Sequence, residues 1–165
     1  MSKVSSEIDG SWIVGMQFSK NDTLYFLWNS AKIDFVFADE SGYLVATREP
    51  STLCEMTDEL SERFPNRLDD IRRFDITNLM QQLRSNPDHR DGILIDVCNL
   101  CSDFLSSISS TEFEQIGEYL GAISRVTLAL RDEDVLREEQ IYKKLTKVEA
   151  LSIAIGIIVT NSKVV

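Results

Sequence analysis

The first third of the chain alternates short apolar runs with polar breaks, a pattern typical of strands joined by tight turns. Aromatic and β-branched residues fill the runs, whereas Asn, Asp, Ser and Gly fill the breaks. The last break, Asp39-Glu40-Ser41-Gly42, ends in a glycine that can adopt a positive φ. We therefore predict an antiparallel β-meander of about four strands, at Ser11–Ser19, Thr23–Asn29, Lys32–Ala38 and Tyr43–Arg48.

After these strands the apolar residues recur at three- and four-residue intervals, which indicates amphipathic helices. A first helix is predicted to be capped by Ser51 and to end before Pro65. A second, shorter helix is predicted to be capped by Thr77 and to end at Asn86-Pro87. A third apolar stripe runs from Ile93 to Ile108.

Two Thr-x-x-Glu pairs mark further helix starts, because a Thr three residues before a Glu can form a capping box. Thr111 and Glu114 open a helix that we expect to run to about Arg131. Thr146 and Glu149 precede the final apolar segment. Between these two helices, another helix is expected to begin after an acidic cap.

The cap of that helix is Asp132. The final apolar segment spans Ala150–Val159. Apolar residues lie on every face of this segment, so we predict a core element enclosed on all sides. The pattern is compatible with either a helix or a strand. The segment has about half of the roughly 20 residues that a membrane-spanning helix needs. We therefore do not expect it to cross a membrane.

Strands followed by helices predict the α+β class, with five or six helices packed on one face of the meander. A chain of 165 residues, 43% of them hydrophobic, is long enough to bury one core. We predict a single domain over residues 1–165, with residues 1–10 flexible, the sheet over 11–48 and a mainly helical part over 51–159.

The charge balance limits the classes of partner. The chain has 27 Asp and Glu against 17 Lys and Arg, a formal net charge of −10. Nucleic acids and anionic membranes would be repelled, because both are bound largely through Lys and Arg. The first ten residues lack the apolar run of a secretory signal, so we expect a cytoplasmic protein.

Acidic residues gather in one part of the sequence. Between residues 112 and 139, eight acids stand against three arginines, which gives a net charge of −5 and half of the total. Such an excess can steer a cationic partner towards the surface that carries it. The candidate partner-binding residues are Glu112, Glu114, Glu118, Asp132, Glu133, Asp134, Glu138 and Glu139, with possible help from Asp39, Glu40, Asp69 and Asp70.

Reactive residues do not form a recognisable catalytic or metal-binding motif. Cys98 and Cys101 have the CxxC spacing of redox sites, but they lie on the apolar stripe of residues 93–108, which predicts buried, inert thiols. A zinc site would need both of them together with Cys54 and His89, the only histidine, which we expect to be a solvated surface residue. We predict no cofactor, no metal and no enzymatic activity.

A small, acidic α+β protein without catalytic groups resembles, in its general profile, the bacterial immunity proteins, including those of contact-dependent growth inhibition systems. The resemblance lies in size, charge and the absence of catalytic groups. It implies a cytoplasmic inhibitor that binds a cognate basic toxin C-terminal domain, commonly a nuclease, through an acidic surface. A third possibility is an acidic adaptor in a larger complex, which would also bind a basic partner through its acidic surface.

The alternative is an enzyme or small-molecule binder with a pocket between the sheet and the helices. Its lining would use Trp12, Trp28, Tyr25 or Tyr43. The neighbouring gene distinguishes the two hypotheses, because a large secreted protein with a basic C-terminal domain favours immunity and a metabolic operon favours the enzyme.

Overall fold

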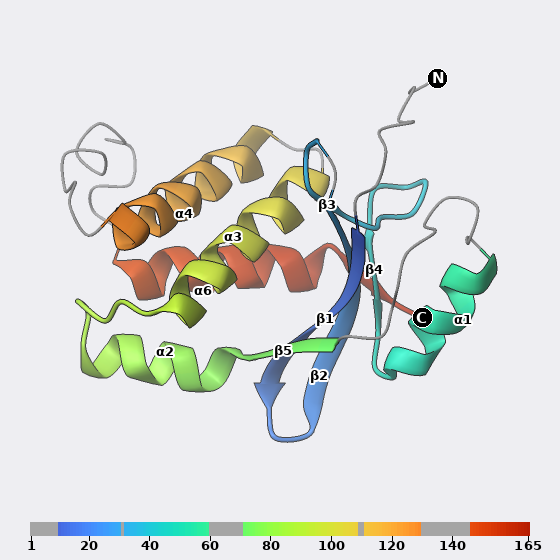
Figure 1. Cartoon of the computed structure of the whole chain (residues 1–165), viewed down its shortest axis with the longest axis horizontal. Helices are drawn as coiled ribbons and strands as arrows, with labels where there is room; N and C mark the ends of the chain where they lie inside the picture. The colour runs from blue at the N-terminus through green and yellow to red at the C-terminus, as the bar shows by residue number, and fades with distance from the viewer. Residues whose placement is uncertain (1–9, 31, 60–70, 109–110, 130–145) are drawn as a thin grey trace. The chain divides into compact units, whose positions relative to one another are not determined.

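The structure is a computed structural model of the chain and describes residues 10–30, 32–59, 71–108, 111–129 and 146–165 (Figure 1). Two compact units form. The first comprises residues 1–75 together with 162–165, and the second comprises Ile76–Asn161. The second unit is therefore an insertion between two strands of the first.

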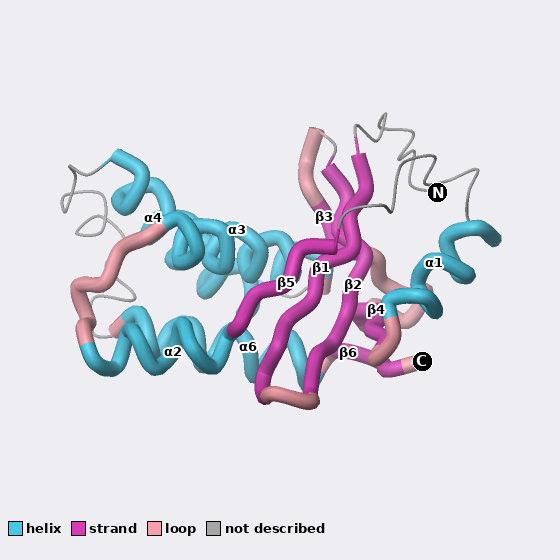
Figure 2. The backbone as a smooth tube through the Cα atoms, turned by 60° about the horizontal axis from the view of Figure 1, so that its bottom comes forward, coloured by secondary structure: helices cyan, strands magenta, loops and turns pink. Residues whose placement is uncertain are grey.

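The first unit is built on a mixed sheet with the strand order β5-β1-β2-β4-β6, and β3 pairs with β2 off this path (Figure 2). β1 and β2 form a long antiparallel hairpin. β5 joins β1 in parallel at one edge, and β6 joins β4 in parallel at the other. The strands are β1 Gly10–Ser19, β2 Asp22–Ser30, β3 Phe35–Val36, β4 Leu44–Thr47, β5 Ile71–Asp75 and β6 Ser162–Val164.

β3 and β4 pair in succession along β2, and the chain between them leaves the sheet in a small hairpin. Oδ1 of Asp39 accepts the N–H groups of Ser41 and Tyr43 at 2.9 and 3.0 Å. Gly42 has a φ of 85°, which confirms the predicted positive φ. The predicted strand Lys32–Ala38 is shortened to two residues because the chain turns away from β2 into this hairpin.

Both faces of the central strands are buried. On one face Ile13 and Tyr25 pack with Leu53 of helix α1, Pro50–Glu59. Met16 and Phe26 point to the opposite face, because side chains alternate along a strand, and both are fully buried. Burying an apolar side chain of this size contributes about 2 kcal/mol, so these strands form the core of the first unit.

The second unit is helical, and its helices are α2 Ile76–Ser85, α3 Gly92–Ser107, α4 Thr111–Ala129 and α6 Lys147–Thr160 (Figure 1). α3 lies against both α4 and α6, and α6 also contacts α2. The buried side chains include Leu83, Phe104, Leu120 and Leu151, one from each helix. The apolar stripes recognised in the sequence therefore meet in one helical core.

The α+β class is confirmed, and so are the antiparallel strands and the described helices. Two helices begin two residues earlier than the predicted caps imply, at Pro50 and Ile76, so Ser51 and Thr77 lie inside α1 and α2 rather than capping them. β5 and β6 were not predicted. The helix expected after Asp132 lies outside the described residues, and the packing of helices on a sheet face stays a prediction, as does the single domain.

α6 shows the predicted capping box. The side chain of Thr146 accepts the N–H of Glu149 at 3.2 Å, and the Glu149 carboxylate accepts the N–H of Thr146 at 3.1 Å. The final apolar segment is thus a helix. It is not enclosed on all sides, because Ile153 and Val159 are each 42% exposed, so that part of the prediction is wrong.

Candidate functional site

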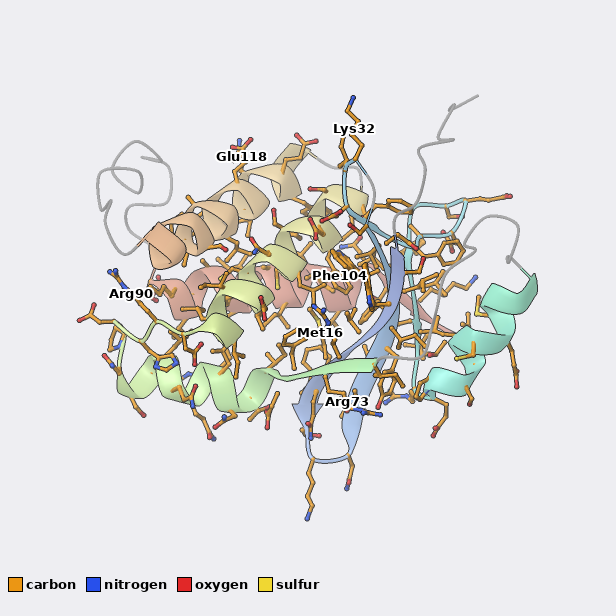
Figure 3. The ribbon with its side chains drawn as sticks, viewed as in Figure 1. Met16, Lys32, Arg73, Arg90, Phe104 and Glu118 are labelled. Carbon is orange, nitrogen blue, oxygen red and sulfur yellow. The ribbon has the colours of Figure 1, made fainter. Side chains whose placement is uncertain are left out.

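The exposed face of α4 carries two of the predicted partner-binding acids, Glu114 and Glu118. They are four residues apart, which places them one above the other on the helix, about 5–6 Å apart at Cβ. Ile116 and Leu120 are buried on the other side of α4 and fix its orientation in the helical core. Figure 3 shows Glu118 pointing away from the neighbouring helices. We call these two glutamates the α4 acidic face.

Neither carboxylate of the α4 acidic face forms an ion pair or hydrogen bond with another described residue. By contrast, Asp22 pairs with Arg48 at 2.9 Å on the surface of the first unit. Like charges four residues apart on a helix destabilise it by about 0.2–0.5 kcal/mol. The α4 acidic face is therefore a small cost to the helix, and a cationic partner would relieve it.

The remaining candidate acids have different surroundings. Glu112 lies in the first turn of α4, and the structure does not describe its side chain. Asp39 holds the hairpin between β3 and β4 through its two backbone hydrogen bonds, whereas Glu40 is exposed at the tip. Seven candidates lie outside the described residues: Asp69, Asp70, Asp132, Glu133, Asp134, Glu138 and Glu139.

A second polar cluster lies where α3 and α6 begin. Asp91 caps α3, because its Oδ1 accepts the N–H of Leu94 at 2.8 Å. Its Oδ2 lies 2.9 Å from Nε2 of His89, and Nζ of Lys147 donates to the backbone oxygen of His89 at 3.2 Å. His89 is thus partly buried and paired, so the expectation of a solvated surface histidine is wrong.

The electrostatics of this cluster are mixed. Burial raises the pKa of Asp91, but the hydrogen bond from the N–H of Leu94 and the neighbouring His89 together lower it by more. The net shift of the pKa is therefore downward. The pKa of Lys147 is lowered, first by burial and then by Arg90. These groups use their polar atoms to cap α3 and to link the loop before it to α6. The cluster is a structural junction.

The cysteines agree with the expectation of buried thiols. Cys98 and Cys101 are fully buried in α3, Cys54 is partly buried in α1, and none of the three forms a disulfide. Burial raises the pKa of Cys98 to about 12 despite nearby Lys147, and burial also raises the pKa of Cys101. A redox CxxC requires the opposite shift, since only the thiolate reacts. The pair therefore lacks the chemistry of a redox site.

The aromatic candidates do not converge. Trp12 and Trp28 are cross-strand partners, and their ring centroids lie 5.0 Å apart. Tyr25 points to the opposite sheet face and packs in the core beside α1, while Tyr43 is exposed next to the hairpin. These four side chains do not line one pocket. The small-molecule alternative stays a prediction without a site built from them.

No protein-family model, curated protein or solved structure matches the chain. Within the described residues, no group of three or more His, Cys, Asp or Glu side chains is placed to hold a metal ion. The described helices also include none that is long and apolar enough to cross a bilayer.

Proposed function

We propose that this protein is an immunity-type inhibitor that binds and neutralises a cognate basic toxin domain in the bacterial cytoplasm. The observation that supports it best is the α4 acidic face. Glu114 and Glu118 are exposed, lie on one side of α4, and have no partner among the described residues. Recognition needs such a complementary surface, whereas catalysis would need reactive groups that converge.

The charge of the chain supports the same proposal. With a net charge of −10, a cationic domain is attracted from a distance, and electrostatic steering can raise association rates tenfold or more. Burying a basic surface of the toxin would also block its approach to a nucleic acid, because that approach depends on the same cations. An acidic inhibitor can therefore neutralise a nuclease without touching its reacting atoms.

A growth assay tests this function. Where the neighbouring gene encodes a large protein with a basic C-terminal domain, that domain is produced in a bacterium from an inducible promoter, with or without this protein. We expect the domain to stop growth alone and to be tolerated when this protein is produced with it.

Two double variants connect the result to the α4 acidic face. Glu114→Lys with Glu118→Lys is expected to weaken protection. Glu49→Lys with Glu55→Lys, at two exposed positions of the first unit, changes the net charge equally and is expected to protect as the wild type does. Toxicity that persists with the wild-type protein would refute the proposed function. Equal protection by both variants would place the interface elsewhere.

A further inference from the structure

Edge strand β5 combines two consecutive arginines with an edge that no other described strand covers. In the sheet of described strands β5 pairs with β1 alone (Figure 2). Residues Ile71–Phe74 make no further backbone hydrogen bond to another described residue. Arg72 and Arg73 are both exposed. An open edge presents N–H and C=O groups that can pair with another extended chain.

The two arginines lie on opposite faces of the sheet, because successive side chains of a strand alternate. The guanidinium of Arg72 lies 5.9 Å from the ring centroid of Trp12. The guanidinium of Arg73 lies 5.6 Å from the ring centroid of Tyr25, and its Nε donates to the Tyr25 hydroxyl at 3.2 Å. Each guanidinium is therefore held near an aromatic ring by a cation–π interaction, which restricts its motion.

Gly15 of β1 makes the arrangement around Arg73 possible. A Cβ at this position would lie 2.9 Å from Cε1 of Tyr25 and 3.3 Å from Cγ of Arg73. A larger residue at this position would crowd the Tyr25 ring and the Arg73 side chain, so glycine is needed for their close approach to β1. Such pre-positioning lowers the entropy that Arg73 loses when it binds an anion.

Neither arginine forms an ion pair with a described carboxylate, although the chain has a net charge of −10. One small anion cannot bridge them, since the sheet lies between them. A strand added to β5 can reach both, because its own successive side chains also alternate between the two faces. Two adjacent acidic residues in that strand would place one carboxylate beside each arginine.

We propose that the β5 edge binds an extended acidic segment of a partner protein, which adds to the sheet as a further strand. Backbone hydrogen bonds to β5 supply the pairing, and the two arginines select adjacent acids. This surface differs in position and in charge from the α4 acidic face, so the proposal does not depend on the proposed function.

Labelled nonapeptides of threonine and valine test the proposal by fluorescence anisotropy with the full chain. One peptide carries two adjacent glutamates at its centre, a second carries two glutamates separated by one residue, and a third carries two adjacent lysines. The separated glutamates point to one face, so they reach one arginine. We expect the adjacent pair to bind about threefold more tightly than the separated pair, and the lysine peptide to bind most weakly.

Variants of the protein then identify the binding edge. Replacing either arginine, Arg72→Gln or Arg73→Gln, should weaken binding of the adjacent-glutamate peptide about threefold, and both together about tenfold. The matched control, Lys20→Gln with Lys32→Gln, removes two exposed cations of the same unit and should leave binding unchanged. Thermal melts establish that every variant is folded.

Peptides methylated at alternate backbone nitrogens test strand addition itself. One alternate set of N–H groups faces β5 and the other faces solvent, so methylation of one set should abolish binding and methylation of the other should not. Equal loss with both sets would show charge attraction without strand pairing and would overturn the proposal. Absence of binding up to about 1 mM would also overturn it, and the arginines would then only protect the edge from pairing.

Discussion

Helices α4 and α6 belong to the same unit and both pack against α3, yet their exposed faces differ. α4 exposes Glu114 and Glu118, whereas α6 exposes Ile153, Gly156 and Val159, and the acid at the start of that face, Glu149, is engaged in the capping box. Beyond its capping box, α6 therefore forms without charges on its outer face. The difference fits the proposal that the glutamates of α4 serve recognition, since the buried faces of both helices supply their packing.

The largest expected effect is a difference in stability between substitutions on the buried and the exposed face of α6. Leu151 is fully buried, so Leu151→Asp leaves an unpaired charge in the helical core and should destabilise the protein by about 3–5 kcal/mol. Ile153→Asp, on the exposed face, should cost about 1 kcal/mol or less. Urea unfolding, with the soluble fraction measured for both, gives the comparison. Similar losses would show that α6 has no exposed face.

Thiol labelling tests whether the packing of α3 against its neighbouring helices keeps its cysteines inaccessible to a reagent. Since burial raises the pKa of Cys98 to about 12, almost no thiolate forms near neutral pH. We expect Cys98 and Cys101 to react with a thiol reagent about a hundredfold more slowly in the native protein than in urea. Cys54, which is only partly buried, should react first. Rapid native modification of the α3 pair would mean that this core opens.

The charge at the start of α3 should make stability pH-dependent. The folded pKa of Asp91 is lowered, so its carboxylate stabilises the protein above its unfolded pKa of about 3.9, and this contribution is lost as the pH falls through the lowered folded pKa. Asp91→Asn keeps a capping side chain but removes the charge, which should cost about 1 kcal/mol at pH 7.

Unfolding free energies of both proteins from pH 7 to pH 2 provide the measurement. The difference between wild type and Asp91→Asn should shrink in acid, because protonated Asp91 no longer carries the charge. A difference that is constant over this range would show that the carboxylate charge contributes nothing to the cap.

Local patterns predicted the parts of the fold that depend on neighbouring residues. The capping box of Thr146 and Glu149, the turn at Gly42 and the apolar stripe of α3 each follow from a few adjacent positions. β5 and β6 were missed because they are short and become strands only by pairing in parallel with distant segments. Edge pairing of this kind leaves little periodicity in the sequence.

The candidate site was predictable only in part, for a similar reason. Sequence spacing placed Glu114 and Glu118 on one helix face, since the helical period alone decides this. It did not show that the Asp39 carboxylate accepts two backbone hydrogen bonds or that His89 pairs with Asp91, although an Asp before the α3 stripe is a capping signal. The arginines of β5 became informative only once Trp12 and Tyr25 were located beside them.

The role of the α4 acidic face in recognition can be measured as the association rate of a basic toxin domain with this protein. Stopped-flow measurements at low and physiological salt compare the wild type with the Glu114→Lys, Glu118→Lys variant and with the Glu49→Lys, Glu55→Lys control. We expect the α4 variant to associate about threefold more slowly than the control at low salt, and the difference in rate to narrow as salt screens the charges. Equal rates for the two variants would contradict a role of the α4 acidic face in recognition.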